Sequence, residues 1–132
     1  MVSQNQNQTR THLEQEGYVV LEGFFGQEEI DCWACDIGWL VETQLRRFGQ
    51  EPSSAGGPVS LLSENLIKLH LQHDGAQGWI YDEVNRQPWI HALAADERMT
   101  SLAKQVLGTS KVGIHPRLNM IMAMPGEDWH LA

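Results

Sequence analysis

The longest stretch of helical periodicity in the sequence lies between Gln27 and Phe48. Its apolar residues recur three or four positions apart, as one face of an α-helix requires: Ile30, Trp33, Ala34, Ile37, Leu40, Val41, Leu45 and Phe48. Acidic residues occupy its first turns and two arginines its last, as the helix dipole favours. Gly49 follows as a stop signal, so the pattern predicts a helix over 27–48. Gly38 lowers its stability by about 1 kcal/mol relative to alanine, unless close packing requires a glycine.

Shorter helices are predicted elsewhere. The first begins at a cap on Thr9 or Thr11 and ends at Gly17. A flexible loop over 50–58 precedes the ambiguous segment 59–72, which contains Leu62, Leu66 and Leu69 at helical spacing but also Ile67, Leu69 and Leu71 in strand-like alternation. We predict a helix there. Three more follow at 77–86, at 88–94, where Pro88 suits a first turn, and from the Asp96 cap to Leu107.

Two stretches have the composition of strands. Tyr18–Leu21 is β-branched and aromatic, and 112–124 lacks a helical period and ends in the apolar run Leu118–Met124. Because strands need neighbours for their backbone groups, most of the sheet is expected to be missing from 1–132. The prediction is one incomplete α+β domain. It has a disordered terminus at 1–8, a helical region at 9–110 with a short strand near 18–21, and the start of a β core at 111–124.

Composition narrows the possible partners. The chain is 42% hydrophobic and 20% charged, with a net charge of -8, and its largest basic cluster is Arg46-Arg47. Nucleic-acid binding needs a basic face, so it is not expected. No apolar run approaches the roughly 20 residues of a membrane span, and no secretory signal is visible. Two cysteines make no disulfide framework, so a cytoplasmic location is expected.

Metal-binding patterns are few. His12-Leu13-Glu14 has the spacing of a strand-borne ligand pair, but in a helix the two side chains point about 200° apart, which favours a solvated face. Cys32 and Cys35, together with His70 and His73, supply four possible zinc ligands. Redox cysteines usually lie at a helix N-terminus, and this pair starts about a turn later. Zinc and redox roles stay open, and small buried structural cysteines are the favoured interpretation.

Two segments carry a family resemblance. The first is LEQEGYVVLEGFF at 13–25 with QEEID at 27–31, which resembles the opening of phytanoyl-CoA dioxygenase family proteins. There a helix leads into a strand "G-Y/F-V-V-L-x-G-F" and a long helix beginning "x-E-E-I-D". The second, PRLNMIMAMPGED at 116–128, is similar to the strand and turn that precede the family's "W-H-Q-D" iron segment.

This resemblance implies the N-terminal, mostly helical portion of a double-stranded β-helix (jelly-roll) oxygenase with its core barrel largely missing. The complete enzyme would use iron(II) and 2-oxoglutarate to hydroxylate a small-molecule substrate. We favour a register that places the first iron ligands just past Ala132. In the rival register His130 is the first ligand and Ala132 replaces the carboxylate, as in related halogenases. Either way 1–132 lacks a complete triad, so no catalytic or metal residue is assigned and the chain alone is expected to be inactive.

Arg117 and Asn119 are the candidate cofactor-binding residues. They lie two positions apart in the predicted strand and so share a face, and the resemblance implies that this face can line the cosubstrate pocket. Arginine suits a carboxylate through paired hydrogen bonds, although an exposed arginine on an edge strand is the more ordinary interpretation. Two rival functions stay open: a non-catalytic binding or regulatory module that pairs its free strand with a partner, and a small zinc-binding protein.

Overall fold

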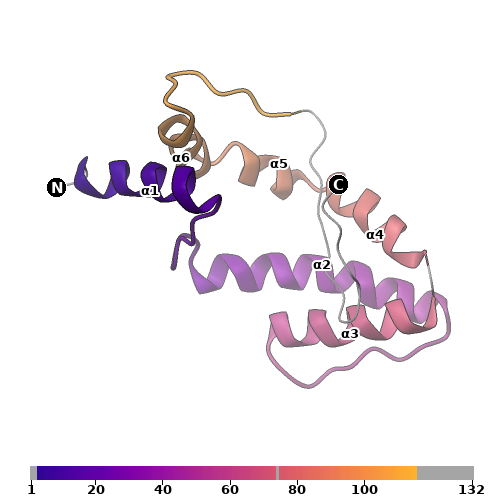
Figure 1. Cartoon of the computed structure of the whole chain (residues 1–132). Helices are drawn as coiled ribbons and strands as arrows, with labels where there is room; N and C mark the ends of the chain where they lie inside the picture. Colours follow the sequence, from indigo (N-terminus) through magenta and orange to yellow (C-terminus); the bar gives the residue numbers. More distant parts are fainter. Residues whose placement is uncertain (1–2, 74, 116–132) are drawn as a thin grey trace. The chain divides into compact units, whose positions relative to one another are not determined.

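The structure is a computed structural model of the chain, and it describes residues 3–73 and 75–115, with side chains from Thr9 onward. These residues form six α-helices (Figure 1): α1 (Ser3–Glu16), α2 (Gln27–Arg47), α3 (Pro58–Gln72), α4 (Ala76–Asn85), α5 (Pro88–Ala94) and α6 (Glu97–Leu107). No strand occurs within these ranges. The described part of the chain is therefore an all-helical fold.

The predicted α+β class, a portion of a jelly-roll oxygenase, is thus wrong for the described residues. Tyr18–Leu21 is irregular rather than a strand, and Tyr18 and Val20 are 62% and 71% exposed. Residues 111–115, expected to begin the β core, are irregular too. β-Branched and aromatic residues favour strands because their side chains pack well on a half-buried sheet. The described residues contain no neighbouring strand with which Tyr18–Leu21 could form a sheet. The rest of the expected β core, 116–124, lies outside the described residues.

The helices follow the apolar periodicity closely. α2, α5 and α6 lie where the sequence predicts them. The ambiguous segment is a helix: Leu69 is fully buried while Leu71 is 77% exposed, whereas strand alternation would have put both on one face. α1 begins at Ser3, inside the stretch 1–8 for which the sequence predicts disorder.

The ends of α2 are fixed by local hydrogen bonds. At its start, the Gly26 N–H donates to the Glu29 carboxylate at 2.9 Å. At its end, Gly49 adopts a left-handed φ of 73°, its N–H donates to Arg46 O at 2.9 Å, and the Gln50 N–H donates to Leu45 O at 2.9 Å. This pair of bonds satisfies carbonyls that a helix end leaves open, which explains why α2 stops there.

Gly38, inside α2, is buried, yet a methyl group placed on it would meet no atom within 4 Å other than its chain neighbours and the backbone of its own helix. Close packing is therefore not what this glycine provides.

The described helices divide into two compact units. One contains α2, α3 and α4, and the other contains α1, α5 and α6. The buried apolar core belongs to the α2–α4 unit: Ala34, Leu40, Val41, Leu45, Leu69, Ile80 and Val84. Among the described side chains of the second unit none is fully buried, so hydrophobic burial stabilises it much less.

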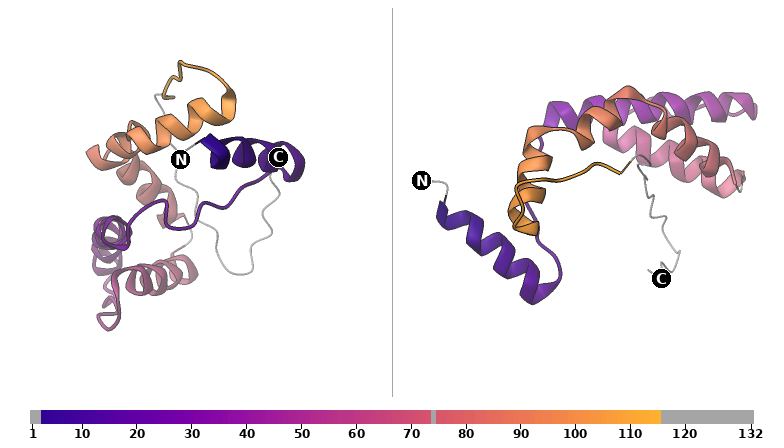
Figure 2. Two further views of the ribbon diagram at one scale, coloured as in Figure 1. Left: turned by 90° about the vertical axis from the view of Figure 1, so that its left-hand side faces the viewer. Right: turned by 90° about the horizontal axis from the view of Figure 1, so that it is seen from above.

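Within the α2–α4 unit, α2 and α3 lie side by side and run in the same direction (Figures 1 and 2). A parallel helix pair needs a connection that returns along the second helix. α3 has 15 residues and so spans about 22 Å. The connection 48–57 has ten residues, which reach at most roughly 33–36 Å when extended. The loop is therefore long enough to return along α2 to the point where α3 begins.

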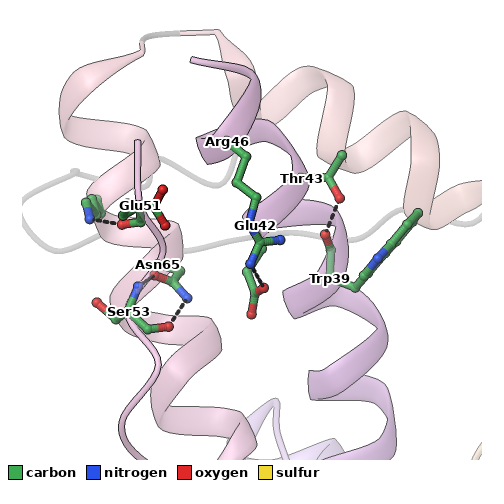
Figure 3. Close-up of polar contacts among 8 residues, drawn as sticks. Trp39, Glu42, Thr43, Arg46, Glu51, Ser53 and Asn65 are labelled. Carbon is green, nitrogen blue, oxygen red and sulfur yellow. Dashed lines mark hydrogen bonds and ion pairs between the residues drawn. The ribbon is translucent and has the colours of Figure 1, made fainter. Parts of the chain in front are cut away.

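Asn65 holds this returning loop against α3 (Figure 3). It is only 1% exposed; its Oδ1 accepts the Ser53 N–H at 2.7 Å and its Nδ2 donates to Ser53 O at 3.2 Å. Nearby, Lys68 Nζ donates to Glu51 O, and Ser53 Oγ donates to the Glu64 carboxylate at 2.5 Å. The bonds from Asn65 and Lys68 satisfy loop backbone groups that a helix or sheet would otherwise pair.

In the second unit, Asp96 caps α6. Its Oδ1 accepts from the Arg98 N–H at 2.8 Å and from Arg98 Nε at 2.9 Å, and its Oδ2 accepts from Arg98 Nη2 at 2.7 Å. The Arg98 side chain first, and its backbone N–H next, lower the pKa of Asp96 from 3.8 to about 2. The folded state therefore binds this proton more weakly than the unfolded state does.

The contribution of the ionised Asp96 to stability should be fully present above pH 3.8 and should disappear as the pH falls through about 2. We expect the Arg98 amide resonance to titrate with a midpoint near 2. Asp96→Asn keeps a capping oxygen but cannot ionise, so its Arg98 amide should show no such step. A step that persists in the asparagine variant would contradict this assignment.

Candidate functional site

The four predicted zinc ligands are not brought together. His73 lies at the end of α3 and stacks on Phe48, which follows α2, with ring centroids 3.8 Å apart and planes at 14°. Phe48 follows Cys35 by 13 residues, which corresponds to about 20 Å along a helix. The parallel pairing thus places the histidines at one end of the helix pair and the cysteines toward the other. Among residues 3–73 and 75–115 no group of three or more His, Cys, Asp or Glu could hold a metal.

The cysteines are not the small buried residues that we expected. Cys32 and Cys35 are both free and exposed. Successive side chains of a helix are rotated by about 100° around its axis. Cys32 and the buried Ala34 are two residues apart, so they lie on nearly opposite sides of α2. Trp39 is also exposed, at 64%, and Figure 3 shows it on the side of α2 that faces away from α3. The outer face of α2 therefore presents two thiols and an indole.

His70 in the last turn of α3 and His73 directly after it pack near the connection between α3 and α4. His70 Nδ1 is hydrogen-bonded to Gln77 Nε2, and His73 stacks on Phe48. The His73 Nε2 atom is buried and has no hydrogen-bond partner among the described residues. Stacking and a side-chain bond fix both rings, which is a structural use of histidine at a helix end.

The His-x-Glu spacing on α1 does not form a ligand pair either. His12 packs edge-on against Tyr18, with ring centroids 5.9 Å apart. Glu14 forms an ion pair with Arg10 at 2.8 Å on the exposed surface. The two side chains engage different neighbours, as the helical angle between them requires.

The remaining predicted site residues lie outside the described residues. These are Arg117 and Asn119, proposed for the pocket wall, and His130, the alternative first iron ligand. The apolar run Leu118–Met124, on which the binding-module alternative depends, lies outside them as well. All of these assignments stay predictions.

Sequence reasoning missed two buried polar residues, Asn65 and Gln44, which are 1% and 3% exposed. The signal was present for Asn65, because it falls three residues after Leu62 and four before Leu69, on the apolar face of its helix. A polar residue at such a position must find a hydrogen-bond partner when it is buried. Here the partner is the backbone of the returning loop.

Comparisons with known proteins supply no relative: no family model, no curated protein and no solved structure matches this chain. The resemblance to the phytanoyl-CoA dioxygenase family therefore stays a prediction. No described helix is long and apolar enough to cross a membrane.

Proposed function

We propose that this chain contributes the N-terminal helical part of an iron(II)/2-oxoglutarate-dependent oxygenase that hydroxylates a small molecule. The supporting observation is the order of elements under the resembling sequence at 13–31. α1 ends before Gly17, an irregular segment carries Tyr18–Leu21, and α2 begins at Gln27. The family pattern has a strand between its two helices, and this chain has an irregular segment at that position.

The described residues do not fit the iron site itself. Such a site needs two histidines and one carboxylate on one face of the metal, and no such group exists in 3–73 and 75–115. The proposal therefore assigns the iron ligands to residues beyond those described, and it gives α1 and α2 a supporting role. No catalytic step is assigned to a described side chain.

The test is to read the gene beyond codon 132 and to compare the 132-residue chain with an extended one. Both are titrated with iron(II) and 2-oxoglutarate without oxygen. We expect the downstream frame to encode His-x-Asp/Glu and a distal histidine. The extended chain should then show the charge-transfer absorption of 2-oxoglutarate bound to iron(II), and the 132-residue chain should not. A downstream frame without these ligands, or tight iron binding by the 132-residue chain, would overturn the proposal.

A further inference from the structure

The outer face of α2 carries two free cysteines that the proposed function does not use. Cys32 and Cys35 are three residues apart in an unbroken helix, so their side chains are neighbours on one face. Both are exposed, and Trp39, one turn beyond Cys35, is 64% exposed on the same side. The question is which chemistry this spacing suits.

Helical spacing suits a shared metal ion better than a disulfide. Residues three apart on a helix have Cβ atoms about 5–6 Å apart. A disulfide needs a Cβ–Cβ separation of roughly 3.5–4.5 Å, so forming one would require α2 to distort. A zinc ion bound at about 2.3 Å from each sulfur in tetrahedral geometry separates the sulfurs by about 3.8 Å, which neighbouring side chains can span without unwinding the helix.

We propose that Cys32 and Cys35 form half of a four-thiolate site for zinc or a similar thiophilic divalent ion, and that a second copy of this chain supplies the other half. Structural zinc takes four ligands, and the described residues offer no third ligand beside the two thiols. A two-fold pair of chains presents the same patch twice, which gives four sulfurs. Binding releases four thiol protons as the thiolates form.

The exposed Trp39 supports a second copy as the occupant of this face. An indole is a large apolar surface, and pairing the α2 outer faces around the metal would remove part of it from water. The pairing also keeps both α2–α4 cores intact, because the buried residues of α2 lie on its other side. This inference is independent of the proposed oxygenase role.

The test is a zinc titration of the purified chain, kept reduced with a phosphine, followed by sedimentation velocity. We expect one zinc per two chains and conversion of monomer to dimer on metal addition. Cobalt(II) in place of zinc should give sulfur-to-cobalt charge-transfer absorption. Cys32→Ser and Cys35→Ser should each abolish binding and dimerisation, and their far-UV circular dichroism should be unchanged because both positions are exposed.

His70→Gln is the matched control. The substitution removes the imidazole, but the glutamine can still form a hydrogen bond with Gln77. It should bind zinc and dimerise like the original chain. Loss of zinc in this variant would instead support a four-ligand site within one chain and would overturn the proposal. One zinc per monomer, no zinc binding at micromolar metal, or stoichiometric zinc in either serine variant would overturn it as well.

Discussion

Replacing Leu69 with alanine should lower the free energy of unfolding by about 2–5 kcal/mol. Leu69 has no exposed surface and shares the core of the α2–α4 unit with Leu45, Ile80 and Val84, which are also fully buried. Truncation removes apolar contacts and leaves a cavity where three helices meet. A loss of this size is a large fraction of the stability of a small domain. Urea unfolding followed by far-UV circular dichroism measures it.

Leu71→Ala is the matched control, since it makes the same chemical change two residues away in the same helix. Leu71 is 77% exposed, so its truncation should change the free energy of unfolding by no more than about 0.5 kcal/mol. Equal losses in the two variants would mean that both leucines are buried, as strand alternation over 67–71 would have it, and would contradict the helical structure of α3.

Replacing Asn65 with alanine should cost about 1–3 kcal/mol, the usual penalty for leaving buried polar groups without partners. The variant loses both bonds to the Ser53 backbone, one accepted and one donated. It should also free the returning loop, because Asn65 is the buried side chain that ties the loop to α3. Urea unfolding gives the stability, and amide hydrogen exchange at Ser53 reports the release of its N–H.

Two further variants separate the backbone bonds from other effects. Ser53→Ala removes only the exposed hydroxyl bond to Glu64 and keeps both backbone bonds, so it should cost far less than Asn65→Ala. Asn65→Asp keeps the acceptor for the Ser53 N–H but loses the donor to Ser53 O and sets a buried carboxylate against that carbonyl oxygen, so its loss should be comparable to that of the alanine variant. If Ser53→Ala were as destabilising as Asn65→Ala, the role given to Asn65 would be wrong.

The helices could be predicted because their signals are local. Apolar spacing, the Asp96 cap and the stops at Gly49 and Gly108 are all readable within a few residues, and the helices other than α1 lie close to the expected bounds. The predicted strand at Tyr18–Leu21 is wrong because a strand depends on a neighbouring strand, which sequence composition cannot supply. Tyr18–Leu21 has strand-like residues but no partner in the described part of the chain.

The candidate site depended on a non-local fact. The sequence could name Cys32, Cys35, His70 and His73 as possible zinc ligands, and it predicted the helices over 27–48 and 59–72 that carry or adjoin them. Whether the two pairs meet depends on the direction in which α2 and α3 pack, which the ten-residue connection 48–57 decides. A short turn gives antiparallel neighbours, whereas a connection of this length permits a parallel pair. The exposure of Cys32, by contrast, follows from the helical angle to Ala34 and could have been predicted.

The parallel pairing of α2 with α3 decides which residues can share a site, and one measurement tests it directly. Nuclear Overhauser effects between assigned side chains of the isotopically labelled chain report which helix ends are close. The stacked rings of Phe48 and His73 should give strong ring-to-ring cross-peaks, because their centroids lie 3.8 Å apart. Cross-peaks from His70 or His73 to the β protons of Cys32 or Cys35, with none between Phe48 and His73, would show an antiparallel pair and contradict this structure.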